Sequence, residues 1–137
     1  ALFEERFGHV EDPSGQLARL NERLSAAQGL IFLTPEYNGA ITSSLKNFID
    51  LFAKGPFSGK PIGVATGSTG ALGGIRAAYQ LQQNILTMNA YPQPQMLTVG
   101  KMDQVLTAEG SIADPGYAQK QARFLDAYLG WVSRFVD

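Results

Sequence analysis

Two hydrophobic patterns alternate along this chain: short continuous apolar runs, and longer stretches with apolar residues at helical spacing. Residues 30–33 form an uninterrupted apolar run, which is typical of a strand buried on both faces of a parallel sheet. Residues 62–66 and 96–99 predict two further strands. Helical spacing predicts helices over residues 15–28, 42–54, 73–89 and from Tyr117 onward. Such alternation favours a parallel α/β sheet with helices on both faces.

Polar residues and glycines indicate where the predicted helices begin and end. Ser14 is a good N-terminal cap for the first helix, and Gly29 is expected just past its C-terminus. In the second helix, Leu51 lies off the apolar stripe that its neighbours form, so this helix carries apolar residues beyond one face. Residues 100–115 are polar and contain glycine, which predicts a surface excursion.

The segment between the first predicted strand and the second predicted helix has the composition of a ligand loop. Pro35 has no N–H and fixes its own φ, so the strand stops there. Asn38 and Gly39 tolerate a positive φ where the chain must bend sharply. Tyr37 can lie flat against a planar ring, although it could equally be an exposed aromatic residue in a simple turn.

A second loop of this kind follows the second predicted strand. Residues 67–74 are rich in glycine but contain neither the lysine of a nucleotide-hydrolysing loop nor the dinucleotide fingerprint. Glycines between a strand and a helix are often turn chemistry, so this loop taken by itself favours structure and ligand binding equally. Two such loops at the carboxyl ends of neighbouring strands favour a ligand site, because open α/β sheets bind ligands at that edge.

Composition excludes several classes of function. The chain has 137 residues, a formal net charge of -1, no cysteine and a single histidine, His9. It has no basic run for nucleic acid, no Cys-type metal site, no apolar stretch long enough to span a membrane, and no Ser/His/Asp or Cys/His set. His9 lies in an irregular approach segment, residues 1–13, and is given no role. We therefore expect one cytoplasmic domain, residues 1–137, with no catalytic side chain and no metal site.

The two loops carry a specific resemblance. Pro35-Glu36-Tyr37-Asn38, followed at the right distance by residues 45–50, resembles the NADPH-dependent FMN reductases, a flavodoxin-like group that includes quinone, chromate and azo-dye reductases. Residues 67–77 resemble the later flavin-edge loop of the same family, and residues 57–61 are also typical of it. The resemblance extends from about Leu24 to Val99.

This resemblance implies a fold, a cofactor and a reaction. The implied fold is a flavodoxin-like three-layer α/β sandwich with a parallel sheet. The implied reaction transfers a hydride from NAD(P)H to FMN and on to a quinone, flavin, azo or metal acceptor by a ping-pong route. The implied cofactor-binding residues are Pro35, Glu36, Tyr37, Asn38, Gly39, Gly67, Ser68, Thr69, Gly70, Gly73 and Gly74. Backbone N–H groups of both loops are expected to donate to the flavin ring, with Tyr37 beside it.

One departure from the family pattern changes these expectations. Family members begin with a strand, a phosphate-binding loop of the type Gly-Ser-x-Arg-x-x-Ser, a helix and a second strand, and nothing in this sequence corresponds to them. We expect a domain that is incomplete at its amino terminus, and a natural protein that is longer there. In the residues given, the strand at 30–33 is then expected to have one unpaired edge and partly uncovered apolar faces. The family also implies a homodimer or homotetramer, which the position of Leu51 supports. The alternative function is a non-catalytic flavin carrier or a module that binds no flavin.

Overall fold

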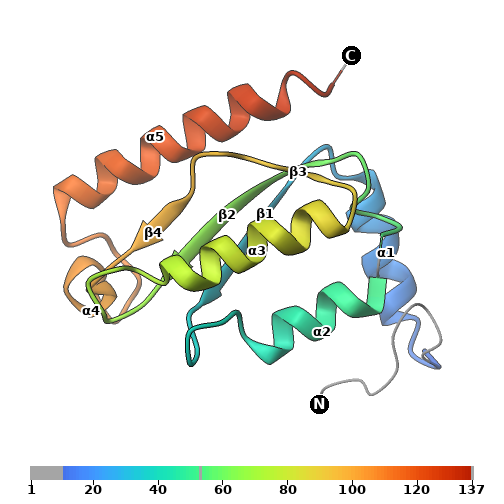
Figure 1. Ribbon diagram of the computed structural model, residues 1–137, viewed down its shortest axis with the longest axis horizontal. Coiled ribbons are helices and arrows are strands. Elements are labelled where there is room, and N and C mark those ends of the chain that lie inside the picture. Colours follow the sequence, from blue (N-terminus) through green and yellow to red (C-terminus); the bar gives the residue numbers. More distant parts are fainter. Residues whose placement is uncertain (1–10, 53, 137) are drawn as a thin grey trace.

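A four-stranded parallel sheet forms the centre of the protein, as seen in the computed structural model, which describes residues 11–52 and 54–136 (Figure 1). Its central strand β2 pairs in parallel with β1 on one side and with β3 and then β4 on the other. The strands are β1 (Leu30–Pro35), β2 (Pro61–Gly67), β3 (Tyr91–Pro92) and β4 (Leu97–Val99). The prediction of three parallel strands is confirmed, and the short strand β3 is additional.

Helices cover both faces of this sheet. They are α1 (Gln16–Ala26), α2 (Ser43–Phe52), α3 (Ile75–Thr87), α4 (Met102–Val105) and α5 (Pro115–Val132). Helices α2 and α3 lie on one face, where their apolar residues form the larger core with Ile62 and Val64 of β2. Helix α5 lies on the other face, where Phe124 packs with Ala65. This arrangement confirms the predicted three-layer α/β sandwich.

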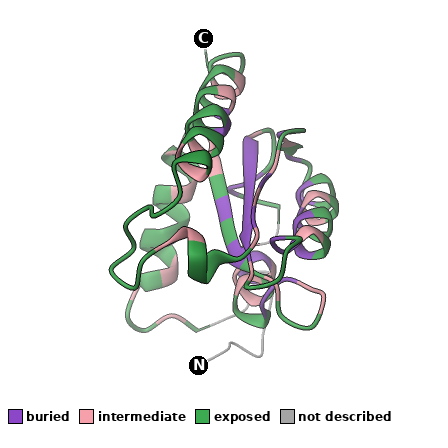
Figure 2. Cartoon of the chain, turned by 90° about the vertical axis from the view of Figure 1, so that its left-hand side faces the viewer, coloured by how far each residue is buried: buried purple, intermediate pink, exposed green. Residues whose placement is uncertain are grey.

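Strand β2 is buried along its whole length, and β1 is not (Figure 2). In β1, Phe32 and Thr34 are buried, while Ile31 is 40% exposed and Leu33 is 75% exposed. Residues 30–33 are therefore not buried on both faces by the described residues, whereas the expected unpaired edge and partly uncovered apolar faces of this strand are confirmed. Helix α5 packs mainly over β2 and β4, and among the described residues no strand pairs with the outer edge of β1.

The ends of α1 differ from the prediction. The carboxylate of Asp12, not the hydroxyl of Ser14, provides most of the cap, since it accepts hydrogen bonds from the backbone N–H groups of residues 16, 17 and 18 at 3.0, 2.8 and 3.2 Å. Gly29 does not adopt the left-handed conformation of a helix C-cap. A Cβ at Gly29 would lie 2.6 Å from Tyr128 Oη and 2.9 Å from Val132 Cγ2, so glycine is needed there for α5 to pack.

Two other expectations also require correction. Leu51 is buried within the chain's own fold, so its position off the stripe of α2 is no argument for self-association. The predicted surface excursion contains α4 and a short antiparallel bridge between Leu106 and Ile112. His9 and most of the approach segment lie outside the described residues. No helix of the described chain is long and apolar enough to cross a membrane.

Lys60 joins the start of β2 to the end of α1. Its Nζ donates hydrogen bonds to the carbonyl oxygens of Leu24, Ser25 and Ala27 at 2.5, 2.7 and 2.6 Å. The last carbonyl groups of a helix have no partner within the helix, and a cation there also interacts favourably with the helix dipole. Lys60 therefore caps α1 from the loop that precedes β2.

We expect Lys60→Met to lower the free energy of unfolding by about 2 kcal/mol, because three carbonyl groups lose a charged donor. Lys54→Met is the matched control, because Lys54 lies on the same connection and is exposed. Urea unfolding followed by circular dichroism measures both variants. Equal stability of the two variants would contradict the capping role.

Candidate functional site

The two loops identified in the sequence lie side by side at the carboxyl ends of β1 and β2. The parallel register places Pro35 opposite Gly67, where the strands end. One further backbone hydrogen bond joins the two segments beyond the strands: the N–H of Glu36 donates to the carbonyl oxygen of Gly67 at 3.3 Å. Residues 35–39 and 67–74, which contain all eleven predicted site residues, are therefore brought together.

The first loop is a tight turn with a fixed shape. Tyr37 and Ala40 exchange backbone hydrogen bonds of 2.9 and 3.0 Å. Asn38 and Gly39 between them have φ values of 50° and 79°, the left-handed pair that such a two-residue turn requires. The turn uses the N–H groups at its two ends, and the Tyr37 ring is exposed beside it. The N–H groups of Asn38 and Gly39 make no hydrogen bond to another described residue.

The second loop is held in place by the segment that follows β4. Ser68 N–H donates to Val99 O at 3.0 Å, and Met102 N–H donates back to Ser68 O at 3.1 Å. The backbones approach so closely that a Cβ at Gly100 would lie within van der Waals overlap of the Ala71 carbonyl oxygen. Sequence reasoning missed residues 99–102 as support for the loop. A glycine directly after an apolar strand was the available signal.

The backbone N–H groups near the tip of this loop stay unused. The N–H groups of Ser68 and Gly73 are hydrogen bonded. Between them, four residues make no N–H hydrogen bond to the described part of the chain: Thr69, Gly70, Ala71 and Leu72. A cavity of about 220 Å³ lies between the two loops. Its lining consists of Glu36, Ser68, Gly70, Ala71, Leu72, Gly74, Ile75 and Arg76. The site thus offers a set of free backbone donors beside an exposed aromatic ring.

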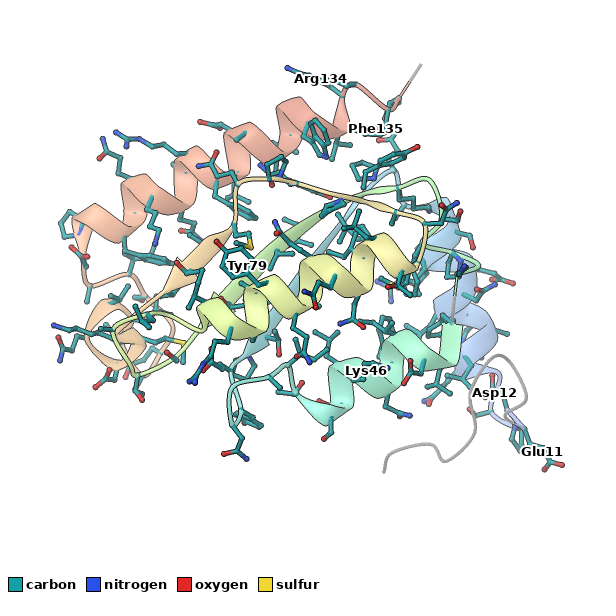
Figure 3. All side chains as sticks on the ribbon, in the orientation of Figure 1. Glu11, Asp12, Lys46, Tyr79, Arg134 and Phe135 are labelled. Atoms are coloured by element: carbon teal, nitrogen blue, oxygen red, sulfur yellow. The ribbon has the colours of Figure 1, made fainter. Side chains whose placement is uncertain are left out.

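One ion pair joins the first loop to the start of α3, directly after the second loop. The carboxylate of Glu36 accepts hydrogen bonds from Arg76 at Nε (3.0 Å), Nη2 (2.6 Å) and the backbone N–H (3.2 Å). The hydrogen bonds from the Arg76 side chain are the largest cause of a lowered pKa of Glu36. By contrast, the pair between Lys46 and Asp50 lies on α2 with its partners four residues apart, as expected for a surface pair (Figure 3).

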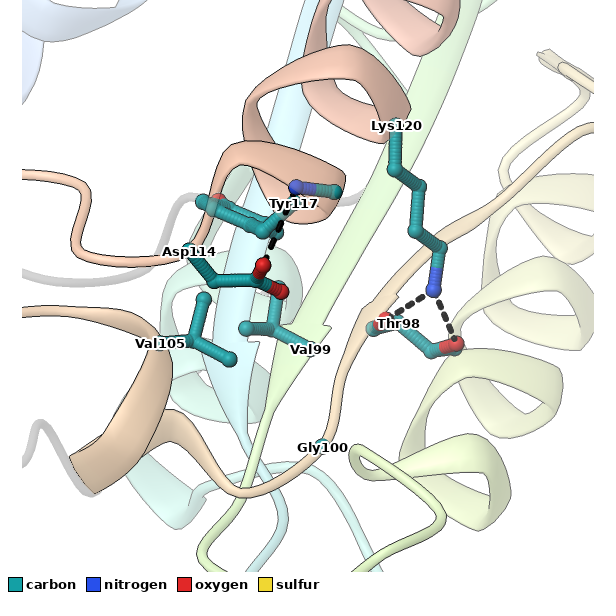
Figure 4. Close-up of a pocket in the computed structure, with 8 residues that line it drawn as sticks. Thr98, Val99, Gly100, Val105, Asp114, Tyr117 and Lys120 are labelled. Atoms are coloured by element: carbon teal, nitrogen blue, oxygen red, sulfur yellow. Dashed lines mark hydrogen bonds between the residues drawn. The ribbon is translucent and has the colours of Figure 1, made fainter.

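A second cavity, of about 180 Å³, lies between the end of β4 and the start of α5 (Figure 4). Its polar side chains are engaged within the protein. Lys120 Nζ donates to the carbonyl oxygen of Thr98 at 2.5 Å, and Asp114 accepts from the N–H of Gly116 at 3.0 Å as the cap of α5. Its engaged polar groups make this cavity a weaker candidate for ligand binding than the cavity between the loops.

The described residues offer no metal site made of side chains. No group of three or more His, Cys, Asp or Glu side chains in residues 11–52 and 54–136 could hold a metal ion. The two loops therefore offer backbone donors, one aromatic ring and one internal ion pair. Such an arrangement can hold a planar, neutral, hydrogen-bonding ring.

Comparison with known proteins agrees with this geometry. A protein-family model described as NADPH-dependent FMN reductase matches residues 2–104. The chain is 33% identical over 121 residues to an NAD(P)H-dependent FMN reductase of Pseudomonas aeruginosa, covering 85% of this chain and 65% of that protein. It is 30% identical over 120 residues to a quinone reductase of Escherichia coli, covering 84% and 64%. The chain thus spans less than two thirds of the length of these relatives.

A solved structure supports the same assignment. The flavoenzyme NAD(P)H:(acceptor) oxidoreductase of Paracoccus denitrificans superimposes with a TM-score of 0.79 at 26% identity, covering 90% of this chain and 71% of that one. The resemblance drawn from Pro35-Glu36-Tyr37-Asn38 and the flavodoxin-like fold are both confirmed. The family model matches most of the residues of this chain, which therefore belongs to the NADPH-dependent FMN reductase family.

Proposed function

We propose that this protein is an FMN-dependent oxidoreductase that uses NAD(P)H to reduce a quinone, flavin, azo compound or oxidised metal by a ping-pong route. The main supporting observation is the set of free backbone N–H groups in residues 38–39 and 69–72, in two loops that follow β1 and β2 at the same edge of the sheet. Gly70, Ala71 and Leu72 also line the cavity there. The names of the relatives support the reaction class, since they include FMN and quinone reductases.

The residues present fit an isoalloxazine ring. Flavin rings carry their polar atoms along one edge, and unpaired N–H groups of two facing loops can donate to such an edge. Gly39 and Gly70 leave the backbone accessible, and the exposed Tyr37 ring offers a flat apolar surface next to the turn. When bound, FMN supplies the hydride chemistry, and this chain's residues bind and orient it.

The described residues do not fit the phosphate of FMN equally well. A helix N-terminus is a ready anion site, yet each long helix of the described chain already has a side-chain oxygen at that position. These oxygens belong to Asp12 at α1, Thr42 at α2, Glu36 at α3 and Asp114 at α5. Three of the four are carboxylates, which repel a dianion. We therefore propose that this chain holds FMN through the ring.

Anaerobic mixing with NADPH tests the proposed function. We expect the chain, loaded with FMN and freed of excess flavin, to lose its yellow absorbance on addition of NADPH and to regain it on addition of a benzoquinone. A yellow protein that NADPH does not bleach would be a flavin carrier. A protein that stays colourless at flavin concentrations well above those of the protein would be a module without flavin. Either result would contradict the proposal.

We also propose that the protein self-associates through the outer face of α3. Tyr79 and Leu86 lie seven residues apart on α3 and are exposed, and Leu72, in the loop before the helix, is exposed as well. Tyr79 lies on α3 in Figure 3, and Leu72 also lines the cavity between the loops. A second copy on this face would lie at the rim of the candidate flavin site, which agrees with the family expectation of a homodimer or homotetramer.

Sedimentation velocity at micromolar concentration tests this interface. We expect Leu86→Glu to shift the protein to monomer, because a charge would be buried in an apolar contact. Leu129→Glu on α5 is the matched control, since both leucines are 63% exposed. A monomeric parent protein, or equal dissociation by both variants, would contradict the assignment.

A further inference from the structure

Glu36 belongs to the motif that suggested flavin binding, but its carboxylate is already occupied. The side chain is 12% exposed, and the carboxylate accepts three hydrogen bonds from Arg76. Arg76 lies 40 residues further along the chain, in the first turn of α3. The carboxylate therefore reaches from the end of β1 across to the helix that follows the second loop.

Arg76 touches the first loop at a second point. A Cβ placed on Gly39 would lie 3.5–3.6 Å from the Cζ, Nε and Nη1 atoms of Arg76, so the guanidinium lies against the tip of the turn. This contact and the ion pair together connect the end of β1, the turn and the start of α3. The Arg76 side chain as a whole remains 72% exposed.

The backbone around this pair is shaped for close approach. Gly74 has a φ of 79°, and a Cβ there would lie 3.3 Å from Glu36 Cβ and 3.1 Å from Thr66 Cβ. Glu36 also donates its own N–H to the carbonyl oxygen of Gly67. The side chain and the backbone of Glu36 thus both bind the second loop or its helix. The distance between the two loops is set at this residue.

From these contacts we infer that Glu36 is a positioning residue, which together with Arg76 fixes the width of the slot between the loops. The inference rests on the proposed function, because the slot is where the flavin ring would lie. The two charges neutralise each other within the pair, so the flavin ring would be bound by the free backbone N–H groups of the two loops. Both guanidinium N–H groups donate to Oε1, and the backbone N–H of Arg76 donates to Oε2, so the two carboxylate oxygens are both held by charge-assisted hydrogen bonds.

A double-mutant cycle separates positioning from direct contact. If Glu36 acts only with Arg76, then Glu36→Gln and Arg76→Met each weaken FMN binding by roughly tenfold, and the double variant is no weaker than either single one. If Glu36 instead contacts the ring directly, Glu36→Gln weakens binding and Arg76→Met does not. Lys46→Met is the control, because it breaks an ion pair on α2 that belongs to neither loop.

Two further readouts keep the test independent of affinity. We expect both single variants to alter the visible spectrum of bound flavin, because the donors of the two loops no longer meet the ring at fixed positions, whereas Lys46→Met leaves it unchanged. In flavin-free protein, amide hydrogen exchange at residues 37 and 40 is expected to rise in both variants, because their turn loses its contact with Arg76. Parent-like exchange, spectrum and affinity in both variants would overturn the inference. Failure of the parent protein to bind FMN would instead contradict the proposed function, and the exchange measurement would still test the positioning role.

Discussion

The parallel pairing of β1 with β2 determines where every candidate site residue lies. Both strands end at the same level, with Pro35 opposite Gly67, so the loops that follow them must leave the sheet together. The Glu36–Arg76 pair and the Glu36–Gly67 hydrogen bond then hold those loops at one separation. A shift of register by one residue would also exchange the buried and exposed faces of β1. The site thus depends on the same pairing that buries Phe32.

The part of the site predicted from the sequence is the part that local chemistry determines. Pro35 ends a strand, and Asn38 and Gly39 make a turn, whatever surrounds them. The burial of residues 30–33 was predicted wrongly, because burial of a strand depends on which elements lie beside it. Among the described residues only one face of β1 is covered.

Contacts that the hydrophobic pattern does not reveal, one of them local and the others between distant segments, account for the other errors. Asp12 caps α1 from four residues before its first turn, and Gly29 is required by a tyrosine almost 100 residues away. Support of the glycine-rich loop by residues 99–102 depends on β4 lying beside β2, which no local pattern encodes. Glu36 was predicted as a site residue, and the structure places it where the first loop meets the second loop and α3. Its ion pair with Arg76 depends on where α3 lies in the fold, which no local sequence pattern predicts.

In the proposed site, the two loops bind the flavin ring through their free backbone N–H groups, without help from the phosphate. Backbone amide chemical shifts of the ¹⁵N-labelled chain, followed during separate titrations with FMN and riboflavin, test this claim most directly. We predict that the amides of residues 38–39 and 69–72 shift most and that both ligands shift them alike. Shifts concentrated at Tyr117 and Lys120, beside the cavity between β4 and α5, would contradict the claim, as would binding of FMN without any binding of riboflavin.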